Sequence, residues 1–222
     1  MKKAIITMLA LVFSVASYAQ LISDKTDNKV TVTFDLFQDF QLQTTDDWNA
    51  GTINPGFSTS LTYNLPLGNS KSNTVAVGLG LSTHNYYSTS RIDDPYAKEL
   101  TFTQYADDED FKRYKINPTY AEVPLELRFR INDAWKIGVG FKFGVMLSTK
   151  SKFVDVNDSD VTIREKYCGI SNIERYAYST TLRVGYKWVS AFASYQFSRV
   201  FTVGTNGPAI TPLSVGVSFA PF

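Results

Sequence analysis

Between Ala121 and Ser148, every second residue is large and apolar over two long runs. A period of two indicates β-strands with one apolar face, and the residues between are mostly charged or glycine. At about 3.3 Å per residue the second run extends roughly 40 Å, enough to cross a hydrocarbon core of about 30 Å at a tilt of about 40°. The runs therefore predict a membrane-spanning hairpin. Its apolar residues are Val123, Leu125, Leu127, Phe129, Ile131, Trp135, Ile137, Val139, Phe141, Phe143, Val145 and Leu147.

The turn between the two runs fixes their register. Asn132-Asp133-Ala134 forms a three-residue loop that pairs Ile131 with Trp135 and keeps both apolar sets on one face. In this register Glu126 lies opposite Gly140 and diagonal to Lys142. We therefore expect a Glu126–Lys142 salt bridge.

The N-terminus has the features of an export signal. Lys2-Lys3 precedes an apolar stretch that ends near Val15, and Ala19 offers a cleavage site, so residues 1–19 predict a signal peptide and residues 20–222 the mature domain. The alternative, an uncleaved anchor, has too short an apolar run. Removing Lys2 and Lys3 changes the formal net charge from +1 to −1, which gives no indication of nucleic-acid binding. The single Cys168 cannot form an intrachain disulfide.

Eight segments alternate, and the connections between them are alternately long and short. This asymmetry is typical of outer-membrane barrels. The predicted fold is all-β, an eight-stranded antiparallel up-and-down transmembrane β-barrel with short periplasmic turns and long outer loops. The strands are expected at 28–40, 55–65, 73–86, 119–131, 135–149, 173–186, 189–200 and 211–222.

Two alternatives to this fold remain open. Residues 100–105 with 111–115, and 153–156 with 161–163, predict two short hairpins around polar turns, which would raise the count to ten or twelve strands. Each piece is shorter than the 9–11 residues or so that a crossing needs, so we expect them to extend neighbouring strands above the lipid. A soluble lipocalin-like barrel would have its two faces inverted.

Aromatic residues concentrate where strands meet loops. Trp135 and Trp188 lie at short turns, whereas Tyr residues lie near the long loops, a distribution that predicts two interfacial girdles. The tyrosines are Tyr86, Tyr87, Tyr120, Tyr176 and Tyr178.

The second face of the strands predicts the interior. An eight-stranded barrel is wide enough only for its own side chains, so buried charges must pair with one another or meet trapped water. We interpret these charges as a structural plug. They are Asp35, Glu122, Glu126, Arg128, Arg130, Lys136, Lys142, Arg183 and Lys187. Pro124 removes a backbone donor from its strand, and we expect a β-bulge there.

The segment Tyr120-Ala121-Glu122-Val123-Pro124-Leu125-Glu126-Leu127-Arg128-Phe129 resembles a strand of the PorT-type "porin family" of outer-membrane β-barrels, which are relatives of OmpX and OmpA in architecture. Leu182-Arg183-Val184-Gly185-Tyr186-Lys187-Trp188 is similar to a later strand and turn of that family. The resemblance implies an eight-stranded outer-membrane barrel. A secretion role of some family members does not extend to every relative.

Catalytic and metal-binding patterns are weak. His84 is the only histidine, without a spaced Ser or Asp motif, and is expected to be a solvated rim residue. The run Asp107 to Asp110 lacks the spacing of a dedicated cation loop. We expect no enzyme activity, no cofactor and no metal site.

The expected function is that of a small outer-membrane protein, with a plugged lumen, that acts as a structural or adhesion module through its extracellular loops. Expected partners are outer-membrane lipid and lipopolysaccharide, the barrel-assembly machinery during insertion, and an extracellular protein bound by loops 87–118 and 150–172. The alternatives are a narrow selective channel or an accessory component of a secretion system.

Overall fold

The computed structural model describes residues 29–68, 70–104, 113–131, 134–156 and 162–220. The predicted signal peptide, residues 1–19, and the acidic run Asp107 to Asp110 lie outside them. Within the described ranges no helix is long and apolar enough to cross a membrane.

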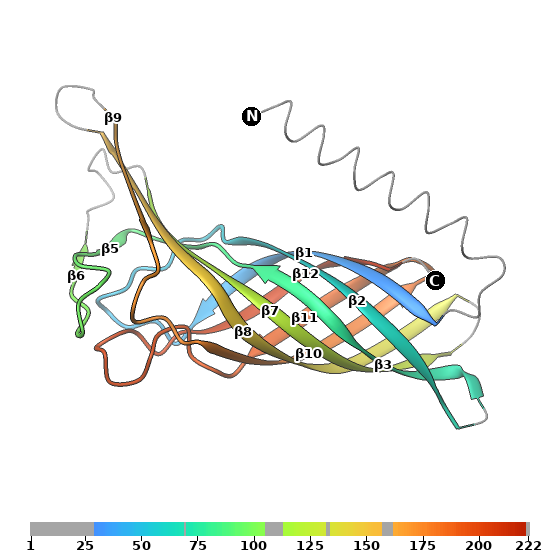
Figure 1. Ribbon diagram of the computed structural model, residues 1–222. Coiled ribbons are helices and arrows are strands. Elements are labelled where there is room, and N and C mark those ends of the chain that lie inside the picture. The colour runs from blue at the N-terminus through green and yellow to red at the C-terminus, as the bar shows by residue number, and fades with distance from the viewer. Residues whose placement is uncertain (1–28, 69, 105–112, 132–133, 157–161, 221–222) are drawn as a thin grey trace.

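Eight strands close into a ring (Figure 1). The ring order is β1, β2, β3, β7, β8, β10, β11, β12, and β12 pairs back with β1. All its pairings are antiparallel, which confirms the predicted fold class and the eight expected strands. The ring strands are β1 (Val30–Leu42), β2 (Pro55–Leu67), β3 (Ser70–Thr83), β7 (Arg113–Arg130), β8 (Trp135–Val156), β10 (Tyr176–Tyr186), β11 (Val189–Gln196) and β12 (Thr211–Phe219).

The apolar face of the ring points outward. On β8, Val139 is 47% exposed and Phe141 41%, whereas Lys142, the next residue along the strand, is 9% exposed. β1 shows the same alternation, with Leu36 exposed and Asp35 buried. This orientation confirms the prediction and excludes the lipocalin-like alternative, which requires apolar side chains inside the ring and charges outside it.

The predicted register is confirmed, but the predicted bulge at Pro124 is wrong. Glu126 lies opposite Gly140, and Lys187-Trp188 forms the two-residue turn between Tyr186 and Val189. Pro124 pairs with Lys142 without a shift in register; the β7–β8 irregularity instead lies between Thr119 and Tyr120. Toward β3, pairing lapses at residues 123–124 and resumes in the same register, because proline has no N–H to donate.

Strands β7 and β8 continue beyond the ring on the side of the long loops. Their outer parts, residues 113–118 and 149–156, stay paired, and β9 (Thr162–Cys168) pairs with β8 (Figure 1). We call the extension formed by β7, β8 and β9 the projecting sheet, and the short strand β4 (Tyr86–Ser88) pairs with its β7 side. This sheet confirms the expected hairpin around residues 157–160. The other expected hairpin is wrong for the residues that the structure describes: β6 (Phe102–Gln104) pairs with β5 (Ser90–Ile92), whereas residues 113–115 pair with β8.

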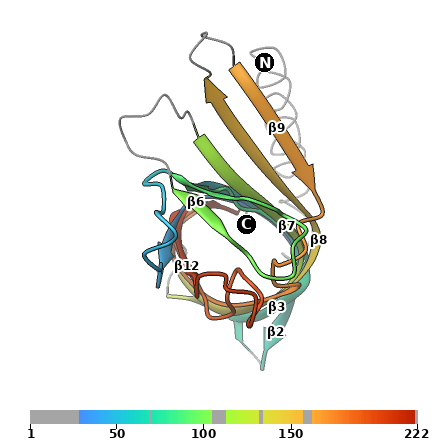
Figure 2. The ribbon, with the colours of Figure 1, turned by 90° about the vertical axis from the view of Figure 1, so that its left-hand side faces the viewer.

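The outer loops share an apolar core of their own, which we call the cap. Figure 2 looks onto the outer end, where β5 and β6 cross the mouth of the ring and the projecting sheet rises from its rim. The Trp48 ring makes edge contacts with the rings of Phe102, Tyr114 and Phe201. The buried residues of the cap are Trp48, Tyr86, Ile92, Leu100, Tyr114, Ile116, Phe153, Ile170, Ile173, Val200, Phe201 and Ile210.

The two predicted girdles hold only in part. Trp135 and Trp188 are exposed at the short turns, and Tyr176 and Tyr178 are exposed at the opposite end. Tyr86 and Tyr120 are buried instead, since both point inward. The position of a tyrosine near a long loop therefore did not indicate whether its side chain faces lipid or the interior.

Candidate functional site

An ion-pair network crosses the interior toward the short-turn end. Arg183 binds Asp35 through both terminal nitrogens, each 3.0 Å from a carboxylate oxygen, and its Nε donates to Glu126 Oε2 at 2.9 Å. Arg128 Nε donates to the other oxygen of Glu126 at 2.5 Å. Ser58 and Ser218 add hydrogen bonds to Asp35 and Arg183. The network therefore links β1, β7 and β10 across the ring.

The predicted Glu126–Lys142 salt bridge is wrong. Lys142 Nζ lies 3.1 Å from Glu122 Oε2, and Ser82 donates to the other oxygen of Glu122 at 2.8 Å. Lys142 is diagonal to both glutamates, so register alone permitted either partner. Glu126 is already bound by two guanidinium groups, which leaves Glu122 for the lysine.

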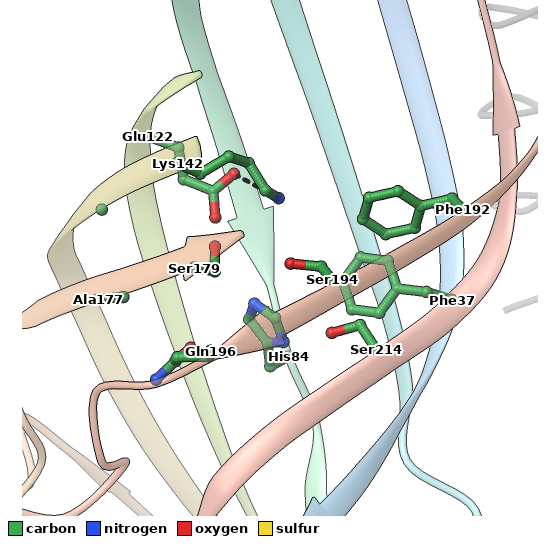
Figure 3. A pocket seen from close by; sticks show the side chains of 11 residues that line it. Phe37, His84, Glu122, Lys142, Ala177, Ser179, Phe192, Ser194, Gln196 and Ser214 are labelled. Carbon is green, nitrogen blue, oxygen red and sulfur yellow. Dashed lines mark hydrogen bonds and ion pairs between the residues drawn. The ribbon is translucent and has the colours of Figure 1, made fainter. Parts of the chain in front are cut away.

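A third cluster lies toward the outer mouth. His84 Nδ1 is 2.8 Å from Asp39 Oδ2, and Ser214 donates to Asp39 Oδ1 at 2.6 Å. The imidazole stacks on Tyr86 and packs near Phe37. Figure 3 shows His84, Phe37 and the Glu122–Lys142 pair pointing into one interior cavity. His84 is buried, so the expectation of a solvated rim residue is wrong.

The remaining predicted interior charges lie nearer the short turns. Lys136 is partly buried and its Nζ is 3.5 Å from the Ala220 carbonyl oxygen. Arg130 and Lys187 are exposed. Glycines make room for the buried carboxylates, as at Gly138, where a Cβ would lie 2.9 Å from Glu126 Oε1.

This arrangement does not provide the geometry of nucleophilic catalysis. Ser214 and His84 both bind Asp39, so the serine donates its hydrogen bond to the carboxylate and not to the imidazole that would act as its base. Among the described residues, no group of three His, Cys, Asp or Glu side chains could hold a metal ion. The contacts are those of buried charges compensated by their neighbours.

The projecting sheet offers a different kind of site, a strand edge. β9 is the terminal strand of its sheet. Gly169 N–H donates to the Thr149 carbonyl at 2.9 Å, and backbone groups alternate sides along an antiparallel strand. The N–H and C=O groups of Arg164 and Lys166 therefore face away from β8. Tyr96 donates to the Cys168 carbonyl on this edge at 2.9 Å, which places the loop around residue 96 beside one end of it.

Sequence reasoning missed the cap, and it left residues 150–152 of β8 as a break between the strand expected at 135–149 and the extension expected at 153–156. The sequence of β8 contains one signal that was available, since the lysines at 150 and 152 alternate with the less polar residues 149, 151 and 153 past Ser148. The cap had no comparable signal, because its residues come from four separate loops and the strands beside them.

A family model described as "Outer membrane protein beta-barrel domain" matches residues 20–206. Among solved structures, Ail, the attachment invasion locus protein of Yersinia pestis, is 14% identical, with 86% of this chain and 97% of that chain covered and a TM-score of 0.38. Its complex with the heparin analogue sucrose octasulfate gives 13% identity, the same coverage and a TM-score of 0.37. A mutant porin of Rh. blastica gives 9% identity, 86% and 99% coverage and a TM-score of 0.19. No curated protein matches this chain.

Proposed function

This chain belongs to the outer membrane protein β-barrel domain family, and from that membership we propose that it is a surface binding module of the outer membrane. The observation that carries the proposal is the edge of β9, which the projecting sheet holds beyond the ring. Exposed strand edges present unpaired N–H and C=O groups that an extended segment of another protein can add to as a further strand.

The proposed partner is an extended segment of an extracellular protein, bound through main-chain hydrogen bonds to Arg164 and Lys166. Lys166→Pro removes one edge-facing N–H, whereas Lys166→Gln removes the charge but keeps that N–H. Surface plasmon resonance against a panel of immobilised extracellular matrix proteins compares the two variants with the unmodified protein. We expect the glutamine variant to keep the binding that the proline variant loses.

Equal binding by the proline variant and the unmodified protein would refute strand addition. Folding is checked by heat-modifiable migration of each membrane-extracted protein on a gel. If the proline variant still migrates as a folded barrel, any loss of binding is due to the change at the edge of β9.

A closed lumen is the second part of the proposal. It is supported by the ion pairs of Glu126 and Glu122, which cross the interior, and by the cap over the mouth. Planar-bilayer recordings of the purified protein are expected to show no steady conductance. Steady conductance would favour the alternative of a narrow selective channel.

The finer relationship to PorT-type proteins rests on the motif from Tyr120 to Phe129. An accessory role in secretion is the corresponding alternative function. Deletion of the gene followed by measurement of secreted proteins tests this alternative, and unchanged secretion would reject it.

A further inference from the structure

Among the residues whose side chains the structure describes, five cations lie on one face of the projecting sheet, and we call this set the outer basic face. Lys115 pairs with Lys152 across β7 and β8, and Lys152 pairs with Lys166 across β8 and β9, so three lysines form a continuous row across three strands. Lys150 and Arg164 lie two positions from this row on the same face, because side chains alternate along a strand. The set is Lys115, Lys150, Lys152, Arg164 and Lys166.

Without a bound anion, this row of lysines destabilises the projecting sheet. Directly opposite residues in an antiparallel sheet have Cβ atoms about 5 Å apart, and like charges there destabilise the sheet. Among the described residues, no carboxylate pairs with Lys150, Lys152, Arg164 or Lys166, and all four are exposed. Lys115 donates to the Asn85 side chain at 2.8 Å and lies 5.5 Å from the Tyr87 ring centroid, so it too has no carboxylate partner among them.

The opposite face of the same sheet is compensated. There Arg91 packs over the Phe153 ring at 4.1 Å and pairs with Glu165 at 2.6 Å. Ionic compensation is therefore present on the face that packs against the cap and lacking on the face that points away from it. An external anion would supply what the outer basic face lacks.

The position of this face identifies the anion. The outer basic face continues the outward side of β7 and β8, whose membrane part carries Val123 and Phe141. Lys150 follows the exposed Leu147 by three residues, which at about 3.3 Å per residue and a tilt of about 40° is about 8 Å above it. The polar headgroup layer on each side of the hydrocarbon is about 5–8 Å thick, so Lys150 lies near its outer limit.

We propose that the outer basic face binds the phosphate groups of anionic glycolipid in the outer leaflet, with Lys152 and Lys166 as the central ligands. Lysine ammonium groups bind phosphate as point charges, and a row of them suits several phosphates on neighbouring headgroups. The site shares Lys166 with the β9 edge of the proposed function, but it uses the side-chain charge of that residue and not its backbone N–H.

The test uses the mature protein in neutral detergent and bisphosphorylated lipid A as the probe, with affinity measured by microscale thermophoresis. The variant is Lys152→Gln/Lys166→Gln. The matched control is Lys29→Gln/Lys98→Gln, which removes the same charge from two exposed lysines elsewhere. We expect the first variant to bind lipid A at least about tenfold more weakly and the control to be unchanged. Binding by the unmodified protein should also weaken as salt is raised.

Two further arms separate the sources of phosphate. Lipid A with its phosphates removed is expected to bind equally weakly to the unmodified protein and to the Lys152→Gln/Lys166→Gln variant. Inositol hexakisphosphate, a soluble polyphosphate, is expected to bind more weakly than lipid A, because it lacks the acyl chains that lie on the adjoining apolar band. Tighter binding of the soluble polyphosphate would overturn the lipid assignment.

If the lysines instead served to stabilise the fold, their replacement would lower the melting temperature. Because the variant relieves repulsion between like charges, its melting temperature in neutral detergent is expected to equal or exceed that of the unmodified protein. A lower melting temperature, or lipid A affinity equal to that of the unmodified protein, would overturn the proposal. Lys166→Pro compared with Lys166→Gln tests the strand edge separately, so the two proposals fail independently.

Discussion

Within the barrel, Glu126 is a carboxylate shared by two guanidinium groups. Arg128 and Arg183 each hold one of its oxygens, and all three side chains are largely shielded from solvent. Desolvated charges are tolerated only when each is compensated, so removing one member leaves the others exposed to the full cost of burial. The sequence indicated that these charges would need partners, and the structure decided which.

Glu126→Gln is expected to destabilise the protein by about 3–5 kcal/mol, since Arg128 loses its ion pair and Arg183 loses one of two. Urea titration of the protein in detergent, followed by tryptophan fluorescence, measures the free energy of unfolding. Glu99→Gln, at an exposed loop position, is the control and is expected to change it by less than about 0.5 kcal/mol. Equal unfolding midpoints for the two variants would contradict the network.

The burial of Tyr114 in the cap predicts that the protein loses stability at high pH. Burial raises the pKa of its phenol from 10 to about 12, because the phenolate is poorly solvated there. The neutral phenol is thus favoured in the folded state, so its contribution is complete below pH 10 and is lost as the pH rises from 10 to 12. The full loss is about 3 kcal/mol.

Tyr114→Phe removes this titration. We expect its stability to fall less steeply between pH 10 and 12 than that of the unmodified protein. Urea titrations at both pH values, monitored by Trp48 fluorescence in a Trp135→Phe/Trp188→Phe background, give the difference. Parallel pH profiles for the two proteins would show that the phenol does not ionise on unfolding of the cap.

At the scale of the strand, glycines set how closely neighbouring strands approach on the inner side. A Cβ at Gly78 would lie 1.9 Å from the Leu61 carbonyl oxygen, which is backbone and cannot rotate away. At Gly144 a Cβ would lie 3.3 Å from the Ala177 Cβ, a distance that needs only a small adjustment. The two glycines occupy comparable inward positions but differ in the space around them.

Gly78→Ala is therefore expected to destabilise the barrel by about 1–3 kcal/mol, and Gly144→Ala by clearly less. The urea midpoint of each variant in detergent gives the comparison. Equal destabilisation would mean that lost backbone freedom or a general intolerance of added volume, and not the close approach of β2 and β3, explains the glycine at residue 78.

At the scale of the whole molecule, the protein has two unlike interiors. The ring encloses hydrogen-bonded charges and hydroxyls, whereas the cap encloses aromatic and branched side chains. The lipid-facing band of the ring is apolar, so the barrel is stabilised from outside by lipid and from within by ion pairs. The cap, in contact with water, is stabilised by its own apolar burial.

Trp48→Ala tests whether the cap unfolds separately from the ring. Truncating this buried ring is expected to lower the free energy of unfolding of the cap by about 3–5 kcal/mol. We expect faster cleavage of the outer loops by trypsin and unchanged heat-modifiable migration of the barrel. Loss of the folded band on the gel would indicate that cap and ring form one cooperative unit.

The sequence predicted most of the fold correctly where the evidence was local. The alternation from Val123 to Leu147 predicted the hairpin, its register and its outward face, because every second side chain of a barrel strand faces lipid and is therefore apolar. The same reasoning failed at Tyr86 and Tyr120, which lie in the right strands or next to them but point inward. It also failed for His84, whose partner Asp39 is 45 residues away.

The sequence by itself determined which segments are strands and which side of each faces lipid, since both follow from a period of two along one stretch of chain. Only the tertiary structure decided the partners of Glu126 and Lys142, the cap around Trp48 and the lysine row across three strands. Those features depend on which side chains meet when the ring closes. Asp35 and Arg183, for instance, are 148 residues apart in sequence, and no local pattern relates them.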